Sequence, residues 1–175
     1  MDTATGVLRH EHEAILGMID AAEEAARRIK EGREVKPETL SGLVEFFRVF
    51  ADRCHHGKEE TCLFPALEQK GLPHDTGPIA VMLQEHVEGR KFIAVMAGAL
   101  EGCAAGRRDA ALQWADAALG YGELLRAHIG KENDVLFVIG ERLLSQSDQD
   151  GLVEAFEDVE NNKIRHLVNH WGACR

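Results

Sequence analysis

A short motif that occurs twice constrains the fold of this chain more than any other feature. His-x-Gly-Lys-Glu, followed by Leu-Phe, begins at His55 and again at His128, an offset of 73 residues. Residues four apart share one face of a helix, so each copy sets a carboxylate beside an imidazole. The fold must therefore accommodate two similar helical segments that present the same polar pair.

A second pair repeats at nearly the same offset. Glu-His stands at residues 11–12 and again at residues 85–86. The chain thus contains a histidine, then His-x-x-x-Glu, and then both elements again. The set that results could bind a pair of metal ions, because two carboxylates can bridge two divalent cations. Its members are His12, His55, Glu59, His86, His128 and Glu132.

Apolar periodicity and helix-end signals predict five helices. Their expected bounds are 3 or 5 to 32, 37 to about 64 with a tail to 71, 78–106, 109–145 and about 148–171. The four histidines lie at similar distances from the turns, and antiparallel neighbours joined by short loops keep such residues at one height. We therefore predict an all-α, up-down-up-down four-helix bundle with an additional C-terminal helix. We expect residues 1–175 to form a single domain, with the bundle core at about 3–145.

The second predicted helix contains two adjacent histidines, and only one of them can lie on the face that points into the core. On α-helical periodicity, His55 and Glu59 share the apolar stripe, whereas His56 and Glu60 lie on the polar face. We expect the first two to face the core and the second two to face water.

Composition excludes several classes of function. The net charge of −10 argues against binding nucleic acid or an anionic membrane surface, since both require basic patches. The polar, acidic N-terminus does not resemble a signal peptide, and no apolar run is long enough to span a bilayer. With four cysteines and no C-x-x-C spacing, the chain is expected to be cytoplasmic.

Burying two carboxylates and four imidazoles without compensation would cost several kcal/mol for each unpaired charge. A pair of metal ions compensates the cluster better than the few nearby basic residues. A donor set of imidazole and carboxylate favours iron or manganese over structural zinc. A buried polar network without metal is the alternative.

These motifs resemble the hemerythrin-like proteins of the HHE cation-binding family, over about residues 5–145. The resemblance implies a four-helix bundle with two non-haem iron ions (Fe2+/Fe3+), with an oxo or hydroxo bridge, that bind dioxygen. It also implies that His12, His55, His86 and His128 are terminal ligands, and that Glu59 and Glu132 bridge.

One position departs from the family pattern. Oxygen-carrying hemerythrins have a further histidine four residues beyond the one on the third helix, where this chain has Arg90. The difference favours sensing or redox handling of dioxygen, peroxide or nitric oxide over simple storage. Glu11 and Glu85 could supply an extra ligand or a hydrogen bond to an imidazole.

Other functions and roles remain open at this point. A di-iron oxidase or peroxidase would use the same site, and a histidine phosphotransfer bundle would instead need exposed histidines. Tyr121 could be a core residue or gate the site. His166 and His170, four residues apart in the last helix, suggest a surface pair or an interface such as a homodimer contact.

Overall fold

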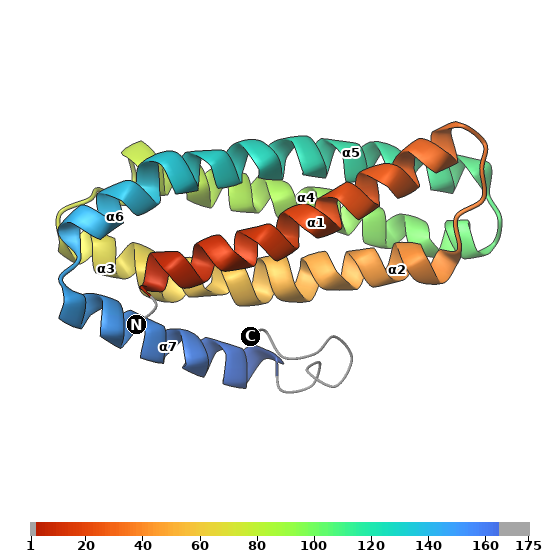
Figure 1. Ribbon diagram of the computed structural model, residues 1–175. Helices are drawn as coiled ribbons and strands as arrows, with labels where there is room; N and C mark the ends of the chain where they lie inside the picture. Colours follow the sequence, from red (N-terminus) through yellow and green to blue (C-terminus); the bar gives the residue numbers. More distant parts are fainter. Residues whose placement is uncertain (1–2, 165–175) are drawn as a thin grey trace.

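The computed structural model describes residues 3–164, with side chains described as far as residue 161. Within this range every regular element is a helix, and the helices form four antiparallel rods with one further helix outside them (Figure 1). Rod 1 is α1 (Ala4–Lys30), and rod 2 joins α2 (Pro37–Phe46), η1 (Phe47–His56), η2 (Glu59–Leu63) and α3 (Phe64–Gln69). Rod 3 is α4 (Gly77–Ala104), rod 4 joins α5 (Arg108–Lys131), η3 (Glu132–Leu136) and α6 (Phe137–Leu143), and α7 spans Gln146–Ile164. The predicted all-α bundle with an additional C-terminal helix is confirmed.

Most helix ends follow the sequence signals. The Thr3 hydroxyl oxygen accepts a hydrogen bond from the Gly6 backbone N–H and caps α1. Pro78 lies in the first turn of α4, and Gly106 ends that rod with a φ of 72°, which suits glycine. Pro65 is an exception, because a proline commonly disrupts a helix, and the expected end of the second helix near residue 64 rests on it. Rod 2 continues through Pro65, which lies in the first turn of α3, where the missing N–H is tolerated.

Rods 2 and 4 contain wider, π-helical turns at related places. The segments η1, η2 and η3 include or adjoin both copies of the repeated motif. In η2 the bonding runs from residue i to i−5, as in the contact from the Phe64 N–H to the Glu59 carbonyl. The corresponding contact in η3 joins the Phe137 N–H to the Glu132 carbonyl. Such turns are rare and often lie at functional sites.

Two apolar clusters fill the bundle, one on each side of a polar layer. In rod 1, Leu8 belongs to one cluster and Ile15 to the other, with His12 between them. In rod 3, Met82 and Ile93 flank His86 in the same way. The cores therefore enclose the histidine layer from above and below.

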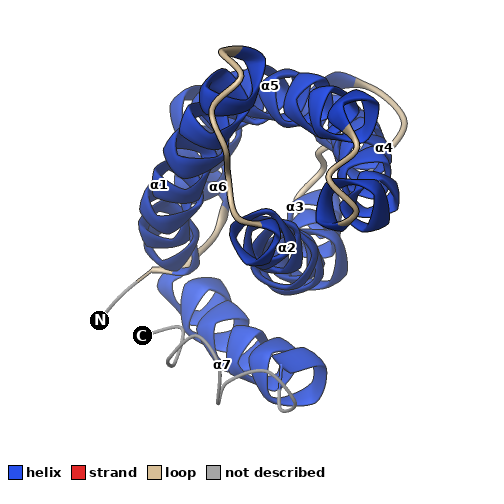
Figure 2. Cartoon of the chain, turned by 90° about the vertical axis from the view of Figure 1, so that its right-hand side faces the viewer, coloured by secondary structure: helices blue, strands red, loops and turns tan. Residues whose placement is uncertain are grey.

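The helix α7 covers one side of the bundle. Viewed along the bundle, the four rods surround a common axis, and α7 lies outside them, near α1 and rod 2 (Figure 2). Leu152 and Phe156 bury their side chains against the bundle. This helix starts two residues earlier than expected, and its predicted end, with His166 and His170, lies outside the described residues. None of the described helices combines the length and the apolar character needed to cross a bilayer.

Candidate metal centre

The four predicted histidines form two pairs in the middle of the bundle. His12 from rod 1 and His55 from rod 2 place their Nε2 atoms 3.0 Å apart. His86 from rod 3 and His128 from rod 4 place theirs 3.2 Å apart. All four side chains are about 1% exposed. The two halves of the repeat therefore each supply one pair of imidazoles.

The two predicted glutamates lie between these pairs, and each faces both. Glu59 Oε1 is 3.5 Å from His55 Nε2, and its Oε2 is 3.4 Å from His86 Nε2. Glu132 Oε2 is 3.2 Å from His12 Nε2, and its Oε1 is 3.3 Å from His128 Nε2. Each carboxylate thus offers one oxygen to each histidine pair, the arrangement expected of a group that bridges two cations. The structure brings all six predicted residues together.

The carboxylate oxygens of Glu59 and Glu132 are buried and have no hydrogen-bond partner among the described residues. Burial, together with the nearby Glu132 carboxylate, raises the pKa of Glu59 well above its ordinary value. Burial also lowers the pKa of His55 to about 4, although the nearby Glu11 opposes this shift. The neutral form of His55, the form that binds metal, is therefore favoured. Glu132 differs from Glu59, because the neighbouring His128 and His12 outweigh its burial and lower its pKa to about 2.

Glu11 and Glu85 orient two of the imidazoles. Glu11 Oε2 accepts a hydrogen bond of 2.9 Å from His55 Nδ1, and Glu85 Oε2 accepts one of 2.9 Å from His128 Nδ1. In each case Nδ1 is engaged and Nε2 faces the centre, as in many metal sites. Of the two roles considered for these glutamates, the structure places them as hydrogen-bond partners of imidazole.

A lysine from the repeated motif holds each of these glutamates. Lys58 donates to Glu11 Oε1 and, over 2.5 Å, to Glu160 Oε1 on α7. Lys131 donates to Glu85 Oε1. The same hydrogen-bonded series of lysine, glutamate and histidine is therefore built twice.

The other two imidazoles, those of His86 and His12, are also held by equivalent residues of the two motif copies. In each copy this residue directly follows the bridging glutamate. His86 Nδ1 donates to Glu60 Oε1 over 2.7 Å, and His12 Nδ1 donates to Asn133 Oδ1 over 3.0 Å. Glu60 also accepts a hydrogen bond of 2.7 Å from the Arg90 guanidinium. Glu60 was expected to face water, but it is half-buried and directs an imidazole.

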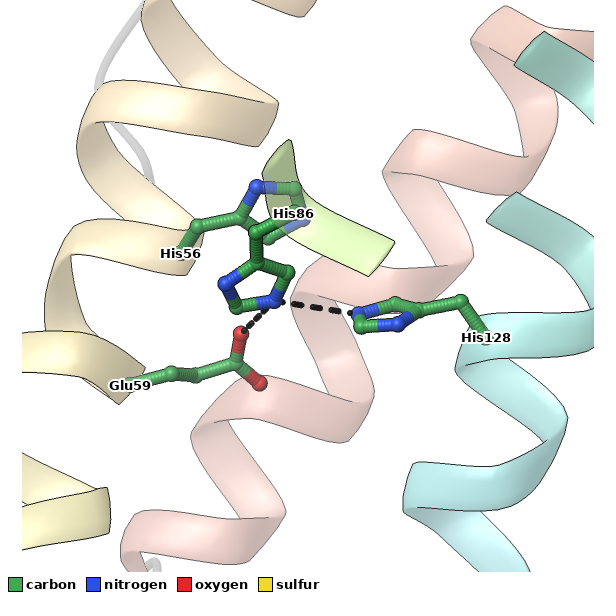
Figure 3. A group of neighbouring side chains, drawn as sticks. All are labelled: His56, Glu59, His86 and His128. Atoms are coloured by element: carbon green, nitrogen blue, oxygen red, sulfur yellow. Dashed lines mark hydrogen bonds and ion pairs between the residues drawn. The ribbon is translucent and has the colours of Figure 1, made fainter. Parts of the chain in front are cut away.

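His56 was also expected to face water, and that prediction is wrong. Its side chain is 2% exposed, and its ring stacks on that of His86 with centroids 3.8 Å apart and 13° between the planes (Figure 3). Because η1 is wider than an α-helix, successive residues turn through a smaller angle, and His55 and His56 both face the interior. One sequence signal indicated this: Ile129, at the equivalent position of the second copy, is apolar.

The layer has an aromatic boundary on one side. Phe137 stacks on His12 with centroids 5.5 Å apart, and Phe64 stacks on His86 at 5.9 Å.

Tyr121 packs edge-on against Phe47 at 4.9 Å, and its buried hydroxyl has no partner among the described residues. Tyr121 is therefore a core residue in this structure, with a pKa raised by burial.

Comparison with known proteins agrees with this geometry. Residues 3–139, a range that includes all six predicted residues, match the family model described as the hemerythrin HHE cation-binding domain. Uncharacterized proteins of Mycobacterium bovis and Mycobacterium tuberculosis are 26% identical over 162 residues, which is 93% of this chain. The chain spans 63% of the length of these relatives.

Proposed function

Because the chain belongs to the hemerythrin HHE cation-binding domain family, we propose that it is a non-haem di-iron protein that binds or senses a small oxidant or diatomic molecule. His12, His55, His86 and His128 would hold the two ions, and Glu59 and Glu132 would bridge them. The ligand would be dioxygen, peroxide or nitric oxide. The observation that carries the proposal is that each glutamate faces both histidine pairs.

The donor set fits two divalent cations. Burial without a hydrogen-bond partner makes the Glu59 carboxylate unfavourable as an anion, and a pair of cations between the two glutamates would remove that penalty. Imidazole and carboxylate without thiolate suit iron or manganese better than structural zinc. Bound iron would supply a redox-active centre that can react with an exogenous small molecule.

The residues around the centre would bind, orient and shield it. The hydrogen bonds to the four Nδ1 atoms fix the ring orientations and keep each Nε2 available as a ligand. The stacked rings of Phe64 and Phe137 exclude water from one side of the layer. The Arg90 guanidinium, in ion pairs with Asp52 and Glu60, is not available as a ligand.

The alternatives use these residues differently. A phosphotransfer histidine must reach a partner protein, whereas His55 and His128 are about 1% exposed, which disfavours that role. A di-iron oxidase or peroxidase would use the same centre, and that alternative stays a prediction. Turnover of peroxide or of a small oxidisable substrate well above that of free iron would support it.

Anaerobic loading with ferrous salt tests the proposal. We expect about two irons per chain and a new near-ultraviolet absorption band when air is admitted. The double variant Glu59→Gln with Glu132→Gln should bind neither ion tightly, because each carboxylate faces both positions. His10→Ala, which alters an exposed histidine, is the control and should load normally. Wild-type protein that takes up no iron would contradict the proposal.

A further inference from the structure

The internal repeat divides the bundle into a first half, rods 1 and 2, and a second half, rods 3 and 4. The helix α7 covers the outer face of the first half, where its Leu152 and Phe156 are buried. Its Glu160 lies beside Glu11 and Cys54, with one donor atom of each within 4.8 Å of the others. Viewed along the bundle, no other described helix lies outside the four rods (Figure 2). A covered face can therefore be compared with its uncovered equivalent.

Residues that are buried or half-buried in the first half have exposed counterparts in the second half, 73 or 74 positions later. Cys54 is fully buried, and Val7 and Cys62 are half-buried. In the same order, their exposed counterparts are Ala127, Val81 and Val135. A Cβ at Gly130 would meet nothing within 4 Å, so this part of the face has room for an incoming side chain. The second half thus presents small apolar residues to solvent where the first half packs against a helix.

These exposed residues form one surface around an ion pair. Lys131 donates to Glu85 and so joins rod 4 to α4 at this level. Val81 lies one turn before Glu85, and Val135 lies about one turn after Lys131. Because the two rods are antiparallel, both valines lie on the same side of the ion pair. We call this surface the open face, and it consists of Val81, Glu85, Ala127, Gly130, Lys131 and Val135.

The lysine of the open face has room for a second carboxylate. In the first half, Lys58 donates to Glu11 and, over 2.5 Å, to Glu160 of α7. Lys131 pairs with Glu85 and with no other carboxylate among the described residues. An ammonium group has three N–H donors, so Lys131 can bind a further acidic group. The charge of the open face therefore favours an occupant that carries a carboxylate, as α7 does.

We propose that the open face binds an acidic amphipathic helix of a partner protein, in the way that α7 binds the first half. The partner helix presents two apolar side chains four residues apart and a carboxylate four residues further on, the spacing of Leu152, Phe156 and Glu160 in α7. Its carboxylate pairs with Lys131, and its apolar side chains cover the exposed valines. The α7 of a second copy does not fit this role, because its apolar side chains are buried against its own bundle. The surface does not require bound metal, so this inference goes beyond the proposed function.

A fluorescein-labelled peptide with the sequence of residues 146–164 is the probe, because α7 has the required spacing. Anisotropy should show saturable binding to one site when the whole protein is titrated into the peptide. Val135→Asp should weaken binding at least about 10-fold, since it places a like charge against an acidic helix. Lys131→Met should weaken it by up to about 5-fold, the usual worth of a half-exposed ion pair.

Two matched substitutions serve as controls and should leave the affinity unchanged. Val87→Asp alters an exposed valine two residues beyond Glu85, on the opposite side of α4. Lys30→Met removes a half-exposed lysine that pairs with Asp116 at the other end of α1. A charge exchange adds a positive test: a peptide carrying Glu160→Lys should bind the wild type weakly and bind the Lys131→Glu protein more tightly.

The remaining outcomes would each overturn the proposal. If the peptide does not saturate by about 1 mM, the open face is not a docking site for such a helix. If it binds equally well to Val135→Asp, it has exchanged with the chain's own α7 on the first half. If the protein sediments as a dimer that Val135→Asp dissociates, and the peptide does not bind, a second copy occupies the open face.

Discussion

Lys58 and Lys131 occupy equivalent positions in the two copies of the motif, but their side chains differ completely in exposure. Lys58 is 0% exposed, whereas Lys131 is 42% exposed. The difference comes from α7, whose Glu160 pairs with Lys58 and whose Phe156 ring lies 5.7 Å from the Lys58 Nζ. The first histidine pair is therefore linked to the C-terminal helix through Glu11 and Lys58.

Replacing Lys58 with methionine should destabilise the fold by about 3–5 kcal/mol, because the buried Glu11 carboxylate would keep its hydrogen bond to His55 but lose the cation that balances its charge. Lys131→Met is the matched control and should cost about 1 kcal/mol or less, since that ion pair is half-exposed. Urea unfolding followed by circular dichroism measures both. Equal effects of the two substitutions would show that the buried link to α7 adds no stability.

Replacing Glu59 with glutamine should stabilise the metal-free protein at neutral pH by about 1–3 kcal/mol, because the neutral amide avoids the extra cost of a buried carboxylate, which must either stay charged or take up a proton. The pKa of Glu59 is raised in the fold, so the unfolded chain releases its proton at a lower pH than the folded chain. Metal-free wild type therefore loses stability as pH rises above the ordinary glutamate pKa, 4.5, and E59Q lacks this loss. Melting temperatures of chelator-treated proteins between about pH 5 and pH 8 check the sign. Parallel pH profiles for the two proteins would contradict this prediction.

Ferrous iron should reverse that order of stability. A ligand that binds only the folded chain adds about 2.7 kcal/mol at 100 times its dissociation constant. Wild-type protein should show this gain in an anaerobic thermal melt. E59Q should gain less, because it offers neither ion a bridging carboxylate at that position. Glu13→Gln, at an exposed position of α1, serves as the control.

Two glycines of α4 should respond oppositely to alanine. A Cβ at Gly102 would lie 2.4 Å from the Ala110 Cβ, so Gly102→Ala should destabilise the fold by about 1–3 kcal/mol. A Cβ at Gly98 would meet nothing within 4 Å. Gly98→Ala should therefore stabilise the fold by up to about 1 kcal/mol through helix propensity. Denaturant midpoints compare the two variants, and a loss of stability in Gly98→Ala would refute the packing argument.

Removing the Tyr121 hydroxyl should cost no stability, because that group is buried and makes no hydrogen bond within the described residues. Tyr121→Phe should unfold within about 1 kcal/mol of the wild type or at a higher denaturant concentration. Its iron content should equal that of the wild type. A variant that loads normally but binds nitric oxide at a changed rate would instead indicate that Tyr121 gates the centre.

The arrangement of the rods and the meeting of six donor residues could be read from spacing, because turns and antiparallel packing fix height along a bundle. The inward direction of His56 and Glu60 could not, since α-helical periodicity places them on the outer face. Local widening of rod 2 depends on how the backbone packs around the layer, and the apolar Ile129 at the position equivalent to His56 is its one sign in the sequence. The burial of Lys58 could not be predicted from the sequence either, because its partner Glu160 lies about 100 residues away along the chain. His166 and His170 stay predictions, because they lie outside the described residues.

The way Glu59 and Glu132 each face both histidine pairs bears on the ancestry of such a chain. A hairpin of two helices that carried only Glu-His and His-x-x-x-Glu would contain one pair of imidazoles and one bridging group. Two copies related by a two-fold axis would complete the whole centre, and the bound cations would hold the two copies together. Tandem duplication and fusion of that hairpin would give a single chain with this internal repeat. Each half could then diverge at one site without disturbing the shared bridges, as His56 and Ile129 have.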